Sequence, residues 1–499
     1  MTLETVSKPA WVACSQPRER VLKPILETVS KPAWAACSQP RERVLKPIVL
    51  FRCAAVAVAL AAAVLHSSAG AQGQPAQKAD IRIRHVRVIH GDGRVTPDAT
   101  VVVHAGLITS VRPAGTTVPM RDETVARLDI DGTGRALMPG FIDAHVHIEP
   151  WTLGVFLTFG VTTVRDLGNS GDLVFPFTGT DAPGRPRVVA SGPVFDGPGG
   201  DTARAIVVAT VGEARAAVRR QVEAGARVIK VSPRVGPALL SVIVSEARAR
   251  GVPVAAHLGA TTATQAADAG VTSIEHASGI AESASRDPAR LAAAHADYFA
   301  GWTAAQLEWR HLSLQRLEDV ARDLAAKGVV LVPTLATHEA LYRLGEPGIL
   351  NNPDLAYVPP EFLTGAWRPA AVMARARWTA EVLLQFRQAF PILQQFVGTY
   401  ARVGGRVVAG SDVGQAFVVP GVSLHRELEL LVACGLSPGQ AIMAATSDAA
   451  ALLGLRDRIG TVEPGKVADL VLVEGNPLTD IRVTRRIVAV IKDGTRVER

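Results

Sequence analysis

The sequence predicts an α/β protein: a distorted (β/α)8 TIM barrel with a small β-sandwich formed from both ends of the mature chain. Residues 80–138 and 459–498 contain short alternating runs broken by glycine turns, which is typical of antiparallel strands. Between them, a helix, a glycine turn and a short apolar strand recur at 212–232, 238–259 and 260–279. Because these strands are continuously apolar, we expect burial on both faces in a parallel sheet, and such repeated units favour a barrel.

These patterns set the expected domain organisation. The leader, the first half of the sandwich, the barrel and the second half of the sandwich are expected at residues 1–71, 72–138, 139–454 and 455–499. Two stretches of the barrel, 281–327 and 338–400, are longer than the repeat. We expect them to be helical insertions on the catalytic face.

The leader is expected to be removed on export. Residues 3–25 recur at 26–48 with a single substitution, and two proline-rich copies are too few for a stacked repeat fold. A short apolar run follows Arg52 and ends in small residues at Ala71, which is typical of a secretory signal peptide. The run is shorter than the roughly 20 residues that a membrane-spanning helix needs. We therefore expect cleavage after Ala71, no stable membrane insertion, and a periplasmic or secreted protein.

Composition narrows the function classes further. Hydrophobic residues make up 48% and charged residues 20%, as in a globular protein. The formal net charge is +7, but residues 1–71 carry nine Lys and Arg against four Glu, so the mature chain has no strong basic character. Nucleic acid is therefore not an expected partner. Cys434 is the only cysteine after residue 71, which excludes an internal disulfide and a cysteine-based zinc site in the mature chain.

Polar side chains stand where the apolar strands end. In "LMPGFIDAHVHIEP" (137–150), two histidines one residue apart point to the same side of a strand, because alternate strand residues share a face. Other strands carry or lead to further histidines, a lysine and an aspartate. Strand ends converge at the catalytic face of a barrel, so these side chains form a candidate metal site. The predicted ligands are His145, His147, Lys230, His257, His276 and Asp412.

These residue types suit metal-assisted hydrolysis. Neutral imidazole and carboxylate bind Zn²⁺, which lowers the pKa of a bound water to about 7. Asp412 could hold a metal, take a proton from that water and return it to the leaving group. Burial among apolar neighbours should lower the pKa of Lys230, and a neutral amine can add CO₂ to give a carbamate that bridges two metals. The alternative is that Lys230 pairs with a carboxylate or with the substrate.

Other polar residues receive separate predictions. Asp166 is expected to be a structural carboxylate at a strand end, and Asp143 could orient a metal ligand. Glu275 precedes His276 and is expected to face the opposite side, towards a helix. Arg234 lies just past the strand of Lys230 and is the best candidate for binding a substrate carboxylate. The full set of candidates for that role is Arg165, Arg234, His338 and His425.

Several motifs together resemble those of the amidohydrolase superfamily, most closely its imidazolonepropionase-like and prolidase-like branch. They are "PGFIDAHVH", "GVTTVRD", "VIKV", "AAH", "SIEHASG", "AGSD" and the tail "GKVADLVLVEGNPL", and the likeness covers most of the chain after about residue 80. The resemblance implies a metal-dependent hydrolase on a distorted barrel with a split β-sandwich. Imidazolonepropionases lack the lysine, so Lys230 favours the prolidase-like side. The implied roles are one metal on His145, His147 and Asp412, a second on His257 and His276, and a bridging carbamate on Lys230.

The predicted function is hydrolysis of an amide-type C–N bond in a dipeptide, an N-acyl amino acid or a cyclic amide. The expected cofactors are two divalent ions, Zn²⁺ in the first place, and the attacking group is a metal-bound hydroxide with Asp412 as the proton shuttle. The same site could hydrolyse an ester, a lactone or an organophosphate. A non-catalytic metal-binding protein of the cell envelope is the alternative from another class. The expected partner is a small-molecule substrate, and the sequence leaves open whether the chain forms a homo-oligomer.

Overall fold

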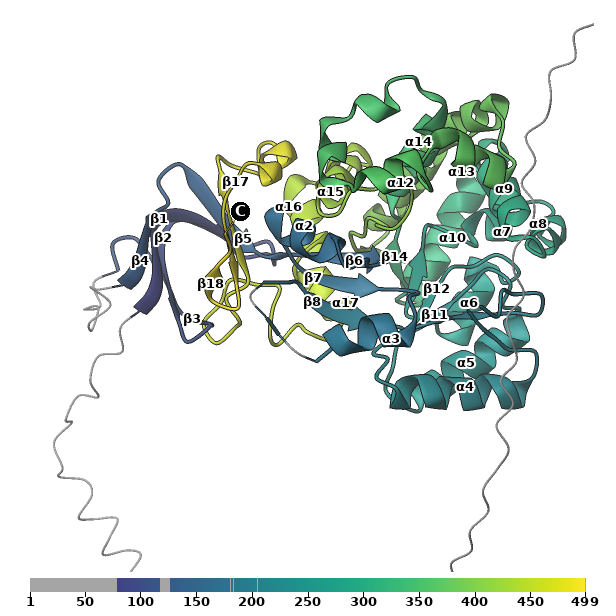
Figure 1. Ribbon diagram of the computed structural model, residues 1–499, viewed down its shortest axis with the longest axis horizontal. Helices are drawn as coiled ribbons and strands as arrows, with labels where there is room; N and C mark the ends of the chain where they lie inside the picture. Colours follow the sequence, from purple (N-terminus) through teal and green to yellow (C-terminus); the bar gives the residue numbers. More distant parts are fainter. Residues whose placement is uncertain (1–78, 117–125, 180, 183, 204, 499) are drawn as a thin grey trace, which may run out of the picture. The chain divides into compact units, whose positions relative to one another are not determined.

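The computed structural model (Figure 1) describes residues 79–116, 126–179, 181–182, 184–203 and 205–498. The chain divides into two units, Met1–Gln74 and Pro75–Arg499, and the second unit holds all the described secondary structure. The predicted leader and signal peptide lie outside the described residues. Among the helices that are described, none combines the length and the apolar character needed to cross a bilayer.

The two ends of the second unit form one eight-stranded sheet (Figure 1). Its strands are β1 (Ala79–Ile89), β2 (Val95–His104), β3 (Leu107–Pro113), β4 (Ala126–Asp131), β5 (Arg135–Pro139), β16 (Leu470–Glu474), β17 (Ile487–Lys492) and β18 (Thr495–Arg496). They follow the order β18-β17-β16-β5-β1-β2-β3, with β4 beside β1. The antiparallel pairing of β16 with β5 joins the two ends, with Leu472 opposite Leu137.

The alternating sequence of these strands reflects one buried face. Ile81 and Ile83 of β1 point into an apolar core that residues of β16 and β17 complete. Arg82 and Arg84 point the other way and form ion pairs with Asp129 of β4. This is the two-residue periodicity of a sheet with one apolar face.

The middle of the chain contains two parallel sheets. One has seven strands in the order β10-β9-β11-β12-β13-β14-β15, and the other has the order β6-β7-β8. Most of their residues are buried, as the apolar runs predict. The strands are β6 (Phe141–Val146), β7 (Val161–Asp166), β8 (Arg187–Ala190), β9 (Val194–Asp196), β10 (Ala205–Val207), β11 (Ile229–Val231), β12 (Val254–Ala256), β13 (Ser273–Glu275), β14 (Val330–Val332) and β15 (Arg406–Val407).

Backbone hydrogen bonds connect these two sheets on both sides. The amide of Arg227 donates to the carbonyl of Ala190 over 3.0 Å, and the amide of Ala144 donates to that of Ala409 over 3.1 Å. The parallel strands alternating with helices agree with the predicted barrel-like α/β architecture. The prediction of a single barrel sheet differs from the structure, in which the described strands divide into two sheets. Strands of only two or three residues, such as β11 to β15, leave few ladder bonds to make one continuous sheet.

Helices follow the parallel strands (Figure 1). Reciprocal capping boxes begin α4 at Thr210 and α6 at Thr262, so both helix starts are fixed by local sequence. The helices outside the two insertions are α2 (Thr152–Thr158), α3 (Gly171–Val174), α4 (Val211–Glu223), α5 (Pro237–Arg248), α6 (Ala263–Ala269), α15 (Val422–Ala433), α16 (Pro438–Ala444) and α17 (Ser447–Leu452).

The two long insertions are helical, as predicted, and they contact each other. Trp302 of the first packs on Trp378 of the second with ring centroids 5.3 Å apart, and Arg377 forms an ion pair with Asp297 over 2.6 Å. The first contains α7 (Ile280–Ala284), α8 (Pro288–Ala294), α9 (Tyr298–Glu308) and α10 (Leu314–Ala326), and the second α11 (Leu335–Tyr342), α12 (Pro360–Thr364), α13 (Pro369–Ala376) and α14 (Ala380–Arg402).

Candidate metal centre

The strand ends bring the six predicted ligands to one end of the parallel sheets. Each side chain lies in a parallel strand or in the turn that follows it. They are His145 in β6, His147 directly after it, Lys230 in β11, His257 after β12, His276 after β13 and Asp412 in the turn after β15.

Three imidazoles surround the carboxylate of Asp412. Its Oδ1 lies 3.3 Å from Nε2 of His147 and 3.6 Å from Nε2 of His145, and its Oδ2 lies 3.7 Å from Nδ1 of His276. One ligand atom from each of His145, His276 and Asp412 lies within 4.8 Å of the others, which is compact enough for a metal ion. His257 extends the group, because its ring centroid lies 4.6 Å from that of His276.

The donor atoms fit a divalent cation. Nε2 of His145, Nε2 of His257, Nζ of Lys230 and Oδ1 of Asp412 are buried without a hydrogen-bond partner among the described residues. Buried polar atoms are normally paired, so four unpaired atoms in one cluster indicate a missing partner. Burial, assisted by neighbouring charges such as Lys230, lowers the pKa of His145, His257 and His276 well below the usual range. These rings are therefore neutral at pH 7 and offer the lone pairs that Zn²⁺ binds.

Lys230 is held in its neutral form more readily than a surface lysine. Its side chain is buried, and burial lowers its pKa to about 8, although the charges of Glu275 and Asp412 act in the opposite direction. Its Nζ makes no hydrogen bond to any described residue, so the structure does not contain the alternative pairing of Lys230 with a carboxylate. A pKa of about 8 makes the neutral amine, which is the form that adds CO₂, more accessible than in a surface lysine.

Glu275 faces the centre, and the prediction that it faces away was wrong. Its Oε2 lies 2.7 Å from Nδ1 of His145, and its Oε1 accepts hydrogen bonds from Arg165 over 3.0 Å and from Ser273 over 2.6 Å. The two-residue alternation fails because His276 has a left-handed φ of 61°, which turns its side chain to the same side. Glu275 thereby orients His145, with Nε2 left for a metal.

Thr334 orients His276 in the same way. Its Oγ1 lies 2.8 Å from Nδ1 of His276, which leaves Nε2 of that ring for a metal. Thr334 has a φ of 49° and Asp412 a φ of 62°, a conformation that non-glycine residues adopt at a free-energy cost of about 1–3 kcal/mol. Such strained positions collect at functional sites, and here they aim side chains inward.

Asp143 fixes the turn that carries Asp412. Its carboxylate accepts hydrogen bonds from the amide of Ser411 over 2.9 Å and from the hydroxyl of the same residue. Burial raises the pKa of Asp143 to about 7. Asp143 therefore positions a predicted ligand, as expected from the sequence. Asp166 is structural, also as expected, because its carboxylate accepts hydrogen bonds from Ile148 and Asn169 over 2.7 Å each.

The candidates for substrate binding are engaged elsewhere. The prediction for His425 was wrong, because its Nδ1 and Nε2 are bonded to Thr484 over 2.9 Å and to the carbonyl of Phe159 over 3.0 Å. Arg165 is buried in its ion pair with Glu275, so its predicted role was wrong as well. Both roles had been assigned from residue type, which says nothing about long-range partners.

Two further candidates are already paired within the chain. Arg234 forms an ion pair with Asp196 over 2.5 Å, which neutralises its guanidinium. His338 is buried, donates through Nε2 to the carbonyl of His276 over 3.2 Å, and stacks on Trp302. Neither contact supports the predicted binding of a substrate carboxylate.

Tyr298 is a residue of the centre that no sequence motif singles out. It begins α9 in the first insertion, and its ring meets that of His257 edge-on at 5.8 Å. Tyr298 is 38% exposed, so it lies where a substrate could reach it. A lone tyrosine in a long insertion carries no motif, and only the fold brings it to His257.

Comparisons with known proteins give a family match and several structural neighbours. Residues 136–497 match the model of the amidohydrolase family. A putative prolidase from Bifidobacterium longum is 27% identical, with a TM-score of 0.61, over 85% of this chain and 96% of its own. A Xaa-Pro dipeptidase with bound methionine has a TM-score of 0.60 at 23% identity, over 84% and 100% of the two chains, which shows a shared fold. An adenine deaminase from Desulforamulus reducens is 31% identical over 94 residues, which are 18% of this chain and 15% of that protein.

Proposed function

Because this chain belongs to the amidohydrolase family, it is a hydrolase of carbon–nitrogen bonds, and we propose that divalent metal ions at the strand-end cluster assist that hydrolysis. The family resemblance drawn from the sequence motifs is confirmed by the match over residues 136–497. The observation that carries the metal proposal is the cluster of four buried donor atoms that lack a hydrogen-bond partner.

We propose two metal sites that share one bridge. His145, His147 and Asp412 would hold one ion, and His257 and His276 the other, with the carbamate of Lys230 between them. The two ions would be close neighbours, since the rings of His145 and His257 each lie beside that of His276, with ring centroids 4.4 and 4.6 Å apart. A bound Zn²⁺ would supply a water of lowered pKa and polarise the carbonyl oxygen of the substrate.

The residues of the chain supply proton transfer and orientation. Asp412 has one oxygen, Oδ1, that is buried and makes no hydrogen bond to a described residue, and this oxygen would take a proton from the attacking water and return it to the leaving nitrogen. Glu275 and Thr334 keep the rings of His145 and His276 in the orientation that presents Nε2. Tyr298 would contact the substrate from the side of His257.

We propose dipeptides and N-acyl amino acids as the first substrates to test, ahead of cyclic amides. The likeness to the putative prolidase supports this order, since it extends over nearly the whole of that chain. Lys230 supports it too, because the resemblance assigns the lysine to the prolidase-like side. We also propose export of the mature chain, on the strength of the apolar run before Ala71.

A substrate panel with metal removal tests this proposal. The purified chain should release amino acids from Xaa-Pro dipeptides or N-acyl amino acids, lose that activity on dialysis against a chelator, and regain it with added Zn²⁺. A matched sample dialysed without chelator is the control. Turnover of esters or lactones alone would move the substrate class to C–O bonds. Full activity after verified metal removal would contradict a metal-dependent reaction.

A further inference from the structure

The N-terminus of α11 is joined to two of the proposed metal ligands. Thr334, the N-cap residue, contacts Nδ1 of His276 through its hydroxyl over 2.8 Å. Thr337, in the first turn, donates its hydroxyl to the carbonyl of Ser411 over 2.8 Å, directly before Asp412. A displacement of this helix end would therefore move both ligands.

Thr334 does not cap its own helix. The first amides of a helix lack partners within it, and a threonine at this position normally accepts a hydrogen bond from one of them. No such bond forms here, because the hydroxyl of Thr334 is directed to His276. Some other group must accept from the first amides of α11, since they are buried and water does not reach them.

Glu427 of α15 is that group. Its Oε2 accepts a hydrogen bond from the amide of Ala336 over 2.7 Å. The backbone amide of Leu335 also lowers the pKa of this carboxyl, as expected for a nearby donor. Glu427 is fully buried, and burial raises its pKa to about 8, so its acceptor role does not need a full negative charge. A side chain from a distant helix thus takes over the capping that Thr334 gives up.

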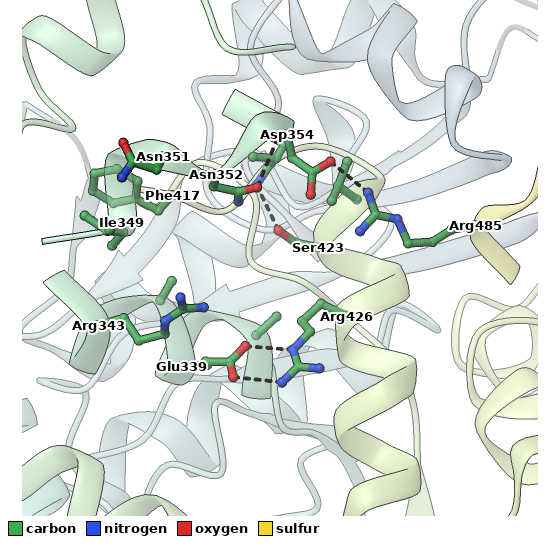
Figure 2. A pocket seen from close by; sticks show the side chains of 15 residues that line it. Glu339, Arg343, Ile349, Asn351, Asn352, Asp354, Phe417, Ser423, Arg426 and Arg485 are labelled. Carbon is green, nitrogen blue, oxygen red and sulfur yellow. Dashed lines mark hydrogen bonds and ion pairs between the residues drawn. The ribbon is translucent and has the colours of Figure 1, made fainter. Parts of the chain in front are cut away.

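A second contact between the same helices lies on the outer side of α11. Arg426, the neighbour of Glu427, forms two hydrogen bonds of 2.8 and 2.9 Å with Glu339 (Figure 2). This ion pair lines a pocket of about 330 Å³ in which Arg343 and Arg485 also have carboxylate partners. Because its arginines are already neutralised, the pocket offers no clear anion site. The Arg426–Glu339 pair provides a matched control, since it joins α15 to α11 without touching the helix N-terminus.

We propose that Glu427 is a positioning residue for the metal centre, which caps α11 from outside so that the hydroxyl of Thr334 is free to orient His276. This inference rests on the proposed metal-dependent function. Without the carboxylate, the hydroxyl of Thr334 turns to the amides of its own helix and releases Nδ1 of His276. Glu427 is fully buried and is not one of the proposed ligands, so its effect passes through His276 and Asp412.

Titration of the metal-free full-length chain with Co²⁺ tests the proposal by affinity and by the visible absorption of the bound ion. Glu427→Leu should weaken Co²⁺ binding by about 10- to 100-fold, the usual effect of removing a group that orients a ligand. Glu427→Gln keeps an acceptor and should bind almost as the parent does. Arg426→Gln should leave both affinity and spectrum unchanged. Parent-like binding by Glu427→Leu would overturn the proposal.

A double variant shows whether Glu427 acts through Thr334. Thr334→Val should weaken binding as much as Glu427→Leu, and Thr334→Val with Glu427→Leu should be no weaker than Thr334→Val alone. If the double variant lost Co²⁺ affinity by the product of the two single losses, the proposal would be overturned. If Glu427→Leu fails to fold, hydrogen exchange of the Ala336 amide decides instead: Thr334→Val should leave its protection intact, and lost protection would show that Thr334 is the cap. Absence of Co²⁺ binding by the parent would refute the proposed function, while the exchange measurement still tests the cap.

Discussion

Asp412→Asn should lower kcat by about 10²- to 10⁴-fold while the fold is retained, because the amide cannot accept the proton of the attacking water. The change preserves the size of the side chain, so the contacts around the turn held by Asp143 should survive. An amide is also a weaker metal ligand, and kcat must therefore be measured with saturating Zn²⁺ and with the metal content of the variant determined.

The measurement separates proton transfer from metal loss. With equal metal content, a large drop in kcat and a small change in KM would assign the loss to the transition state. Parent-like turnover by a fully loaded variant would contradict the role of Asp412 as the proton shuttle. A drop that tracks the metal content alone would leave Asp412 as a ligand and place the shuttle elsewhere.

Arg165→Met should destabilise the chain by about 3–5 kcal/mol, because it leaves the buried carboxylate of Glu275 without its cation. The guanidinium of Arg165 contacts Glu275 over 3.0 Å and the carbonyl of Ala144 over 2.6 Å, and both charged side chains are almost fully buried. Urea unfolding of the metal-free variant measures the loss. Arg322→Met, which breaks an exposed pair with Glu318, should cost no more than about 1 kcal/mol.

A second substitution separates stability from ligand orientation at this pair. Arg165→Met with Glu275→Leu removes both charges and should recover part of the stability, since apolar replacement of a whole buried pair is often neutral. It should not recover metal affinity, because Nδ1 of His145 loses its carboxylate partner. Recovery of metal affinity in the double variant would contradict the orienting role of Glu275.

The sequence predicted the elements that local patterns determine. Alternation identified both halves of the terminal sheet, and the apolar runs identified the parallel strands with His145, His257 and His276 at their ends. The ligand types could be predicted because the C-terminal ends of parallel strands converge whatever the exact sheet topology. The division into two parallel sheets could not be predicted, since it depends on how many backbone hydrogen bonds such short strands form with their neighbours.

The residues that support the ligands lay beyond sequence reasoning for two physical reasons. Glu275 was assigned to the wrong side because alternation assumes extended backbone, and the left-handed φ of His276 breaks it. His425, Thr334 and Glu427 have their roles through partners that lie 58 to 266 residues away in the sequence, and no local pattern encodes such contacts.

The metal content of the purified chain decides whether the centre holds a carbamate-bridged pair of ions. The chain should be prepared without chelators, with and without bicarbonate, beside Lys230→Ala and the surface control Lys327→Ala. We expect about two divalent ions per chain in the parent and in Lys327→Ala, and a metal content in Lys230→Ala that is lower and does not respond to bicarbonate. A single ion per chain that neither Lys230→Ala nor bicarbonate changes would contradict the carbamate-bridged pair.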